Sequence, residues 1–327
     1  MTQAPALPRR HLLALAASLP LAGVALAARA QGKPAKVLTT TAQVAELVRA
    51  VAGDRAVVEN LLGEGIDPHT YKLTRSDVAR LMGAEAVFYN GLLLEGKMTD
   101  ALERVGKTGR PSVAVAEGIG KDSLLTPAGF EGEPDPHVWM DVSLWRRGLE
   151  VVRDALSSFR PADAATFKVN ADAYAKELER LHGYAADVLA SVPQERRVLV
   201  TAHDAFNYLG RAYAVEVVGI QGISTESEAG LRRIEELVAM LVDRKVPAVF
   251  VETSVTDRNV RALVEGAAAR GHKVVIGGSL FSDAMGAPGT YEGSYVGMID
   301  HNVTTIARAL GGNAPAGGFQ GRLALAR

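Results

Sequence analysis

The chain has 327 residues, 48% of them hydrophobic, with 36 basic and 37 acidic side chains and no cysteine. This length allows two domains with substantial cores, whereas the lack of cysteine excludes disulfide scaffolds, thiolate metal sites, thiol nucleophiles and a lipid anchor attached through cysteine. The near-zero net charge and the aromatic content of 6% argue against a protein that binds nucleic acid. Any bound metal must therefore be held by nitrogen and oxygen atoms.

The first thirty residues are typical of a cleaved export signal peptide. Arg9 and Arg10 precede an apolar run over residues 12–28, and the sequence Ala-Arg-Ala at 28–30 matches a signal-peptidase site. The paired arginines fit either twin-arginine export or an ordinary positive leader, and a retained membrane anchor is the alternative interpretation. Cleavage removes three arginines and no acidic residue, which leaves 33 basic and 37 acidic side chains, a net charge of −4. We therefore expect a soluble periplasmic protein with no stable membrane anchor.

From residue 36 onward, short β-branched runs alternate with longer helical patterns, an order typical of an α/β fold with mostly parallel sheets. Strands are predicted at residues 37–41, 57–62, 86–89 and 113–116. Helices are predicted at residues 43–52, after the capping-box sequence that begins at Thr74, and at residues 142–159, where Arg160 and Pro161 oppose continuation. These elements define an N-terminal α/β lobe over residues 33–160.

Residues 162–192 are predicted to form one long helix. They contain no proline and only one glycine, Gly183, and they are rich in alanine, glutamate, lysine and leucine. Apolar residues recur along one helical face at spacings of three and four. Such a helix extends about 45 Å, more than one compact domain needs, so we expect a connecting helix over residues 161–192.

After this helix the alternation of strands and helices resumes. Strands are predicted at residues 198–201, 215–219, 248–252 and 274–276, and helices near residues 228–243, 255–269 and 295–310. These elements define a C-terminal α/β lobe over residues 193–327. The predicted fold is therefore two parallel-sheet α/β lobes joined by one long rigid helix.

The tripeptide Asp-Pro-His occurs twice, ending at His69 and at His137. Proline fixes its own φ and favours extended geometry at the preceding residue, so each imidazole is presented from a stiffened loop. A metal ligand needs such rigid presentation. An ordinary turn is the alternative interpretation for either tripeptide taken alone.

His203 and Asp283 follow predicted strands, at the carboxyl ends where open α/β sheets place their ligands. Together with His69 and His137 they form a set of three imidazoles and one carboxylate, two from each lobe and all from loops between strands and helices. This donor set suits Zn²⁺ and, with a bidentate carboxylate, Mn²⁺ or Fe²⁺.

Four segments around these residues resemble the ligand segments of the TroA-like zinc/manganese substrate-binding proteins of ABC transporters, which form periplasmic solute-binding protein family 9. They are Asp-Pro-His-Thr-Tyr at residues 67–71, Pro-Asp-Pro-His-Val-Trp-Met-Asp at 134–141, Thr-Ala-His-Asp-Ala-Phe at 201–206 and Phe-Ser-Asp-Ala-Met-Gly at 281–286. Residues 219–226 are also similar to the family's stretch after the third ligand. The resemblance covers about residues 33–310.

The resemblance implies that the metal lies in the cleft between the two lobes, with His69, His137, His203 and Asp283 as its ligands. It also implies a receptor that delivers Zn²⁺ or Mn²⁺ to a membrane ABC permease, with Fe²⁺ as the less favoured ion. Some zinc-dedicated members carry a long histidine- and acid-rich loop before the second ligand, whereas residues 116–135 are acidic and contain no histidine before His137. This departure weakens the interpretation as a dedicated zinc receptor and is compatible with manganese as the physiological metal.

Binding rather than catalysis is expected, because four protein ligands close the coordination shell whereas a catalytic zinc keeps one position open for water. The chain also lacks the His-Glu-x-x-His and Gly-x-Ser-x-Gly motifs. We therefore expect a monomeric receptor that is not an enzyme. The alternatives are an exported mononuclear metal hydrolase with Glu252 or Glu226 as its base, and a metal-free adhesin or binder of an organic solute.

Further acidic residues near the four candidates could orient the ligand imidazoles by hydrogen bonding. The best placed is Glu252, at the end of its predicted strand, for which an ordinary ion pair is the alternative interpretation. The others are Asp67, Asp135, Asp141 and Asp204.

Overall fold

Four parallel strands form the first sheet, in the order β2-β1-β3-β4. They are β1 (Ala35–Thr39), β2 (Ala56–Asn60), β3 (Ala86–Tyr89) and β4 (Ser112–Ala114). β1 pairs with β2 on one side and with β3 on the other, and most side chains of β1 and β3 are buried, as expected for strands covered on both faces. The four predicted strands of this half are therefore confirmed, with small shifts of their bounds.

The computed structural model describes residues 1–2, 33–127, 130 and 132–324. The chain divides into the units Met1–Lys33 and Pro34–Arg327, and every described helix and strand belongs to the second unit. Apart from residues 1 and 2, the predicted signal peptide over residues 1–30 lies outside the described residues. Within the described ranges, no helix is long and apolar enough to cross a membrane.

Four helices follow the strands of the first half: α1 (Ala42–Ala52), α2 (Arg75–Gly83), α3 (Thr99–Lys107) and α4 (Val142–Phe159). α2 begins with the predicted capping box, in which Thr74 accepts from the amide of Asp77 and the Asp77 carboxylate accepts from the amide of Thr74. α4 has the predicted bounds, and Asp141 caps its first turn. α3 is missing from the prediction, because no side chain caps its start and marks it in the sequence.

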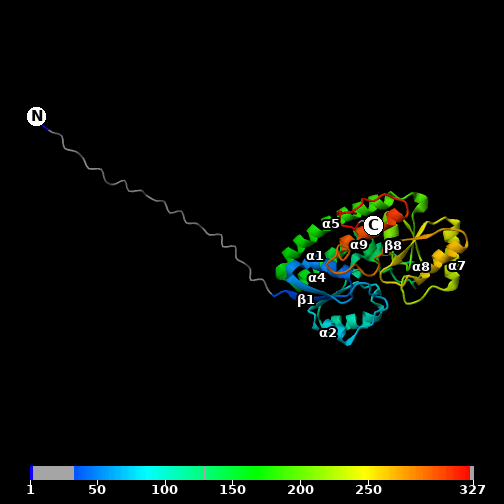
Figure 1. Cartoon of the computed structure of the whole chain (residues 1–327). Coiled ribbons are helices and arrows are strands. Elements are labelled where there is room, and N and C mark those ends of the chain that lie inside the picture. Colours follow the sequence, from blue (N-terminus) through cyan, green and yellow to red (C-terminus); the bar gives the residue numbers. More distant parts are fainter. Residues whose placement is uncertain (3–32, 128–129, 131, 325–327) are drawn as a thin grey trace. The chain divides into compact units, whose positions relative to one another are not determined.

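The predicted connecting helix is α5 (Ala164–Ala190), which is 27 residues long and follows the short 3-10 turn Pro161–Asp163. Near its start, Asn170 donates to the carbonyl of Val51 in α1, and further along Tyr184 hydrogen-bonds with Thr304 of α9 (Tyr295–Ala309). Figure 1 shows α5 as the long green helix beside α1 and α9. α5 therefore contacts helices from both halves of the chain.

Two further parallel strand pairs belong to the second half. β5 (Val198–Thr201) pairs with β6 (Glu216–Gly219), and β7 (Ala248–Glu252) pairs with β8 (Val275–Leu280). β5 and β7 contact each other, so the two pairs lie side by side. Three more helices belong to this half. α6 (Asn207–Tyr213) is short, has no side-chain cap and is missing from the prediction. α7 (Leu231–Asp243) and α8 (Arg258–Ala269) begin three residues later than predicted.

The prediction for β8 is wrong at its end, because the strand continues to Leu280 rather than stopping at residue 276. The pair Gly277 and Gly278 suggests a loop in the sequence, but both lie within the strand. A Cβ on Gly277 would come within 2.7 Å of Ala309 and 2.8 Å of Phe250. Glycine is therefore required here by the close approach of α9 and β7.

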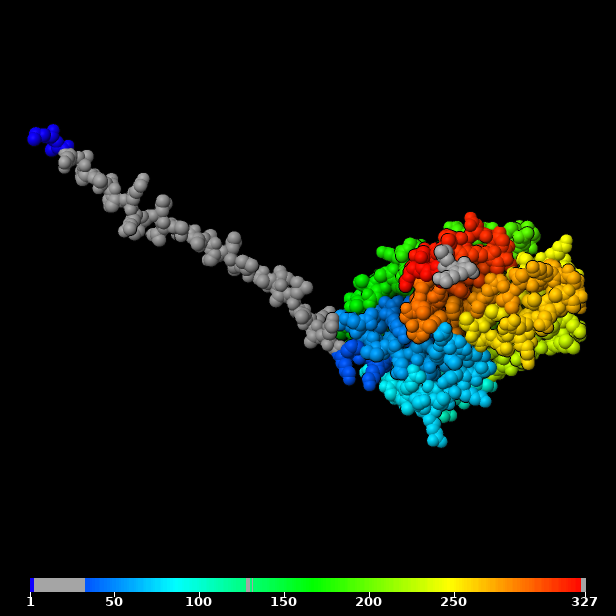
Figure 2. Space-filling model, viewed as in Figure 1, coloured from blue at the N-terminus to red at the C-terminus, as the bar shows by residue number. Residues whose placement is uncertain are grey.

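One apolar cluster runs through both halves of the chain. It includes Phe88 of β3, Phe250 of β7 and the two tryptophans, Trp139 and Trp145. Figure 2 shows the orange segment of the second half directly against the blue N-terminal part of the first half. This continuous core brings the loops at the carboxyl ends of strands from both halves to one place.

Candidate metal centre

The structure brings His69, His137, His203 and Asp283 together into one buried cluster, with one ligand atom of each within 4.8 Å of all the others. Nε2 of His69 lies 3.4 Å from Nε2 of His137. The two oxygens of Asp283 face different rings: Oδ1 lies 3.3 Å from Nε2 of His137, and Oδ2 lies 3.2 Å from Nε2 of His203 and 3.8 Å from Nε2 of His69. The four side chains are at most 3% exposed.

These distances fit a single metal ion. Zinc bonds of about 2.0–2.2 Å at tetrahedral angles place neighbouring donor atoms about 3.3–3.6 Å apart. Among the described residues, Nε2 of His203 and both oxygens of Asp283 are buried without a hydrogen-bond partner. Buried polar atoms are normally hydrogen-bonded, so these converging donors indicate a cation as their missing partner.

The two Asp-Pro-His tripeptides adopt the same local conformation. Oδ1 of Asp67 accepts from the backbone amide of His69 at 2.9 Å, and Oδ1 of Asp135 accepts from the amide of His137 at the same distance. An aspartate that accepts from the amide two residues later forms an Asx turn, a geometry set by neighbouring residues alone. The repeated sequence therefore presents both imidazoles from the same kind of turn.

Two carboxylates also hold the rings of ligand candidates. Oδ1 of Asp135 lies 2.8 Å from Nδ1 of His137, and Oε2 of Glu252 lies 2.6 Å from Nδ1 of His203. A carboxylate at Nδ1 fixes the proton there, so that Nε2 carries the free lone pair. Both Nε2 atoms point into the cluster. The geometry therefore supports the interpretation that Asp135 and Glu252 orient the imidazoles of His137 and His203.

The pKa values of His69 and Asp283 are both lowered, but by different causes. Burial lowers the pKa of His69 to about 4, with the neighbouring imidazoles acting in the same direction and Asp283 opposing them. Burial acts to raise the pKa of Asp283, but His203 and His137 outweigh it and hold that pKa well below its usual value. Asp283 is therefore ionised and supplies the negative charge of the cluster.

The pKa values of His137 and His203 are raised, whereas that of His69 is lowered. Burial acts to lower the pKa of His137, but Asp135 and Asp283 outweigh it and raise the pKa to about 9. Glu252 and Asp283 likewise outweigh burial at His203 and raise its pKa well above the usual value. The carboxylates thus stabilise positive charge at this position, whether it is carried by protons or by a metal ion.

The backbone just before Asp283 is held by side chains that the sequence analysis did not single out. Nε1 of Trp139 donates to the carbonyl of Ser282 at 3.0 Å, and Nε2 of Gln43 donates to the same carbonyl at 3.3 Å. The side chain of Asn302 bonds both backbone groups of Phe281. Trp139 lies within the resembling segment 134–141, which is the one signal that could have identified it.

The remaining candidates have other roles. Asp141 caps α4, and Asp204 lines a separate cavity beside β6. Glu226, considered as a hydrolase base, is 45% exposed and pairs with Lys97 at 2.6 Å. Asp67 holds the backbone of His69 and also accepts from the hydroxyl of Thr225 at 2.6 Å.

Residues 91–97 match the Gly-x-x-x-x-Gly-Lys pattern of phosphate-binding loops. Met98 stands where that motif requires Ser or Thr. The buried carboxylate of Glu95 accepts from the amides of Asn90 and Gly91, at 2.7 and 3.0 Å. These amides therefore bind the chain's own carboxylate, and the geometry does not support a phosphate site.

Comparison with protein families finds one match along most of the chain. The family model "ZnuA: Zinc-uptake complex component A periplasmic" matches residues 37–309. This range includes the four residues of the cluster and all described strands except the first two residues of β1.

Known proteins of this kind are similar in sequence and in structure. The manganese-binding lipoprotein MntA of Bacillus subtilis is 44% identical over 288 residues, which are 88% of this chain and 94% of MntA. The zinc-binding protein TroA of Treponema pallidum is 46% identical over 283 residues, 86% of this chain and 91% of TroA. The solved structure of TroA matches with a TM-score of 0.82 at 45% identity over 85% of this chain and 99% of that chain. Fe(III)-bound YtgA of Chlamydia trachomatis matches with a TM-score of 0.76 at 28% identity, over 85% of this chain and 99% of that chain.

Proposed function

The chain belongs to the ZnuA family of periplasmic zinc-uptake components, and we propose that it is a receptor that binds Zn²⁺ or Mn²⁺ with high affinity and delivers the ion to a membrane ABC permease. The observation that carries this proposal is the buried cluster of three imidazoles and one carboxylate. Two of its members come from each half of the chain, so a movement between the halves would open the cluster and release the ion.

We propose His69, His137, His203 and Asp283 as the ligands of the transported ion. One oxygen of Asp283 with three imidazoles makes a tetrahedral set suited to Zn²⁺, and both oxygens make a five-coordinate set suited to Mn²⁺. The similar proteins MntA and TroA are named for manganese and zinc respectively. Zn²⁺ outcompetes Mn²⁺ at most nitrogen and oxygen sites, so the physiological ion is best identified by elemental analysis of protein isolated from its own cells without added metal.

The geometry opposes a hydrolase. Glu252 uses one carboxylate oxygen for the amide of His203 and the other for its ring, so it is not free to act as a base. Glu226 pairs with Lys97 at the surface. Four protein donors fill the coordination shell of a tetrahedral ion and leave no position for a water molecule to attack a substrate.

The wider organisation is part of the same proposal. Residues 1–30 act as a cleaved export signal, residues 33–160 and 193–327 form the two lobes, and residues 161–192 connect them. The mature protein works as a monomer in the periplasm. The sequence has no cysteine to carry a lipid, which supports a receptor without an anchor of that kind.

Metal titration tests the proposed function. EDTA-stripped protein is titrated with Zn²⁺ and with Mn²⁺ by isothermal calorimetry, and we expect a single ion to bind per chain. The affinity of H137A and D283A for the ion should fall by more than the roughly 10- to 100-fold that is typical when a residue hydrogen-bonded to a ligand is replaced. H272A is the matched control, because the ring of His272 lies outside the cluster and bonds the carbonyl of Val246. Wild-type protein that binds neither ion would refute the proposal.

A further inference from the structure

His69 is held by fewer contacts than the other two imidazoles of the cluster. His137 and His203 are each fixed at the backbone amide and at Nδ1 by one carboxylate. His69 has a carboxylate on its backbone amide only, and no side chain of the described part of the chain bonds its Nδ1. His69 is 3% exposed while the other two are fully buried. It is therefore the imidazole nearest to solvent and the least restrained.

The one carboxylate that holds His69 is itself held from the other half of the chain. Oδ1 of Asp67 accepts from the amide of His69. Oδ2 accepts from two hydroxyls, that of the neighbouring Thr70 at 3.0 Å and that of Thr225, in the other half, at 2.6 Å. Thr225 belongs to the loop of residues 221–230 between β6 and α7. A hydrogen-bonded chain thus runs from Thr225 through Asp67 to His69.

An ion pair crosses between the halves beside this chain of bonds. Nζ of Lys97 lies 2.6 Å from Oε1 of Glu226, the residue after Thr225. Lys97 follows Gly96, and Gly96 packs against the main chain of His69. A Cβ added to Gly96 would lie 3.5 Å from the carbonyl oxygen of His69. Two successive residues of the 221–230 loop therefore bind the segments that carry and support His69.

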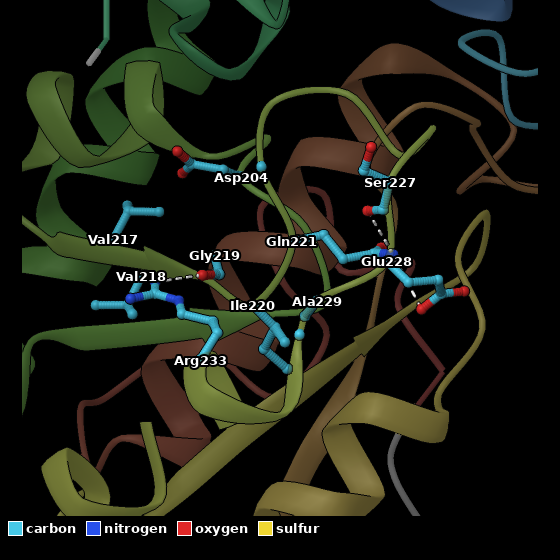
Figure 3. A pocket seen from close by; sticks show the side chains of 12 residues that line it. Asp204, Val217, Val218, Gly219, Ile220, Gln221, Ser227, Glu228, Ala229 and Arg233 are labelled. Carbon is cyan, nitrogen blue, oxygen red and sulfur yellow. Dashed lines mark hydrogen bonds between the residues drawn. The ribbon is translucent and has the colours of Figure 1, made fainter. Parts of the chain in front are cut away.

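The 221–230 loop is held to its own half at its two ends. There the amide of Gln221 donates to the carbonyl of Ala202 at 3.0 Å, and Glu228 accepts from the side chain of Asn259 at 3.1 Å. Both of its ends line a cavity of about 600 Å³ beside β6 (Figure 3). In Figure 3, Gln221 points toward Ser227 and Glu228, but its Nε2 hydrogen bonds to them are long, at 3.4 and 3.3 Å. Oε1 of Gln221 is buried without a hydrogen-bond partner among the described residues. Between these ends, and among the described residues, Thr225 and Glu226 make no hydrogen bond to the second half outside the loop itself. The middle of the loop can therefore move, although Ile223 within it is buried.

From these contacts we propose that Thr225 and Glu226 form a latch that positions His69 through Asp67 and Lys97 and sets the rate at which the ion leaves the site. When the latch is closed, Thr225 holds the Asp67 carboxylate, and with it the turn that carries His69, against the second half, so that His69 stays on the ion. When it opens, His69 is the first ligand to separate. This inference rests on the proposed function, because it concerns the release of the bound metal ion.

The decisive experiment compares the release rate of Zn²⁺ in T225V and in wild type. Zn²⁺-loaded protein is mixed with excess EDTA in a stopped-flow instrument, and the decay of the bound form is followed. Loss of a hydrogen bond to a charged acceptor should accelerate release by roughly tenfold or more. T225S keeps the hydroxyl and should release Zn²⁺ at the wild-type rate. T108V is the matched control, because the Thr108 hydroxyl donates to the carbonyl of Val105, away from the site.

The ion pair provides an independent measurement. E226Q should release Zn²⁺ up to about fivefold faster, since exposed ion pairs are weak, and its rate should lose the dependence on salt that screening of the pair causes in wild type. E216Q is the matched control, because it breaks an equally exposed pair, with Arg244, inside the second half. The melting temperature of each metal-free variant should fall by only a few degrees, as expected for one lost surface contact in a chain of this size. A larger fall would indicate a general loss of stability rather than a latch.

The outcomes separate this inference from the function on which it rests. Wild-type release rates in both T225V and E226Q would overturn the latch while leaving the receptor intact. Equal acceleration in T225V and T225S would also overturn it, because the hydroxyl would then be irrelevant. Absence of Zn²⁺ and Mn²⁺ binding by wild type would instead overturn the proposed function.

Discussion

Glu252 binds His203 at two points with one carboxylate. Oε1 accepts from the backbone amide of His203 at 2.8 Å, and Oε2 lies 2.6 Å from its Nδ1, although the two residues are 49 positions apart in the chain. Glu252 ends β7, and His203 follows the adjacent strand β5. The pair fixes the main chain and the ring together, which leaves only Nε2 free to act as a donor atom.

E252Q should lower Zn²⁺ affinity by roughly 10- to 100-fold. The amide oxygen of glutamine can still accept from one N–H, but its NH₂ group cannot accept from Nδ1, so the ring loses its orientation and its negative partner. Competition with a chelator of known affinity measures the change. E236Q, which alters an exposed carboxylate of the same half that pairs with Arg232 on α7, serves as the control. An unchanged affinity in E252Q would mean that the carboxylate does not orient the ring.

The two buried tryptophans provide a matched pair of variants. Nε1 of Trp139 donates to the carbonyl of Ser282, whereas Nε1 of Trp145 has no hydrogen-bond partner among the described residues. W139F should weaken Zn²⁺ binding by roughly fivefold or more, the equivalent of about 1 kcal/mol for the lost hydrogen bond beside Asp283. W145F loses similar volume and should bind Zn²⁺ as wild type does. Calorimetric titration of both tests this, and equal losses would argue for packing rather than the hydrogen bond.

Metal affinity should rise with pH between pH 6 and 8. The pKa of His137 is raised to about 9, so before metal binds this ring is protonated across this range, and the pKa of His203 is raised well above its usual value, so this ring keeps its proton to higher pH than a free imidazole does. Zn²⁺ must displace these protons, and each displaced proton lowers the apparent affinity about tenfold per pH unit of acidification. His69, with a pKa of about 4, is neutral throughout and adds nothing to this dependence above pH 6.

Calorimetry in buffers with different ionisation enthalpies counts the protons released on binding. We expect about two at pH 7, one from each raised imidazole. H203A should release one fewer. An affinity that stays constant from pH 6 to pH 8 would contradict the assignment of these two rings as ligands.

Two glycine substitutions should change stability in opposite directions. A Cβ at Gly183, on the exposed face of α5, meets nothing within 4 Å, so G183A should raise the free energy of unfolding by about 0.5–1 kcal/mol. A Cβ at Gly277 would collide with Ala309 and Phe250, so G277A should lower it by about 1–3 kcal/mol. Urea unfolding of the metal-free proteins measures both values. A stabilising G277A would show that α9 can withdraw from β8 at no cost.

Interactions within a few residues could be predicted from the sequence. The capping box at Thr74, the bounds of α4 and the turns that carry His69 and His137 all depend on contacts inside short segments, so their sequences are sufficient to indicate them. α3 and α6 are missing from the prediction for the same reason, because they are short and no local cap marks their starts.

The sequence by itself determined the α/β order of elements, the long helix α5 and the four side chains able to bind a metal. Only the tertiary structure decided that Glu252 meets His203, that Trp139 reaches Ser282 across 143 positions, and that Thr225 holds Asp67 across 158. These contacts join segments from different parts of the chain, and no local pattern encodes which of them pack together. They follow from the continuous apolar core, because burial of that shared surface fixes the two halves against each other and so sets every distance in the site.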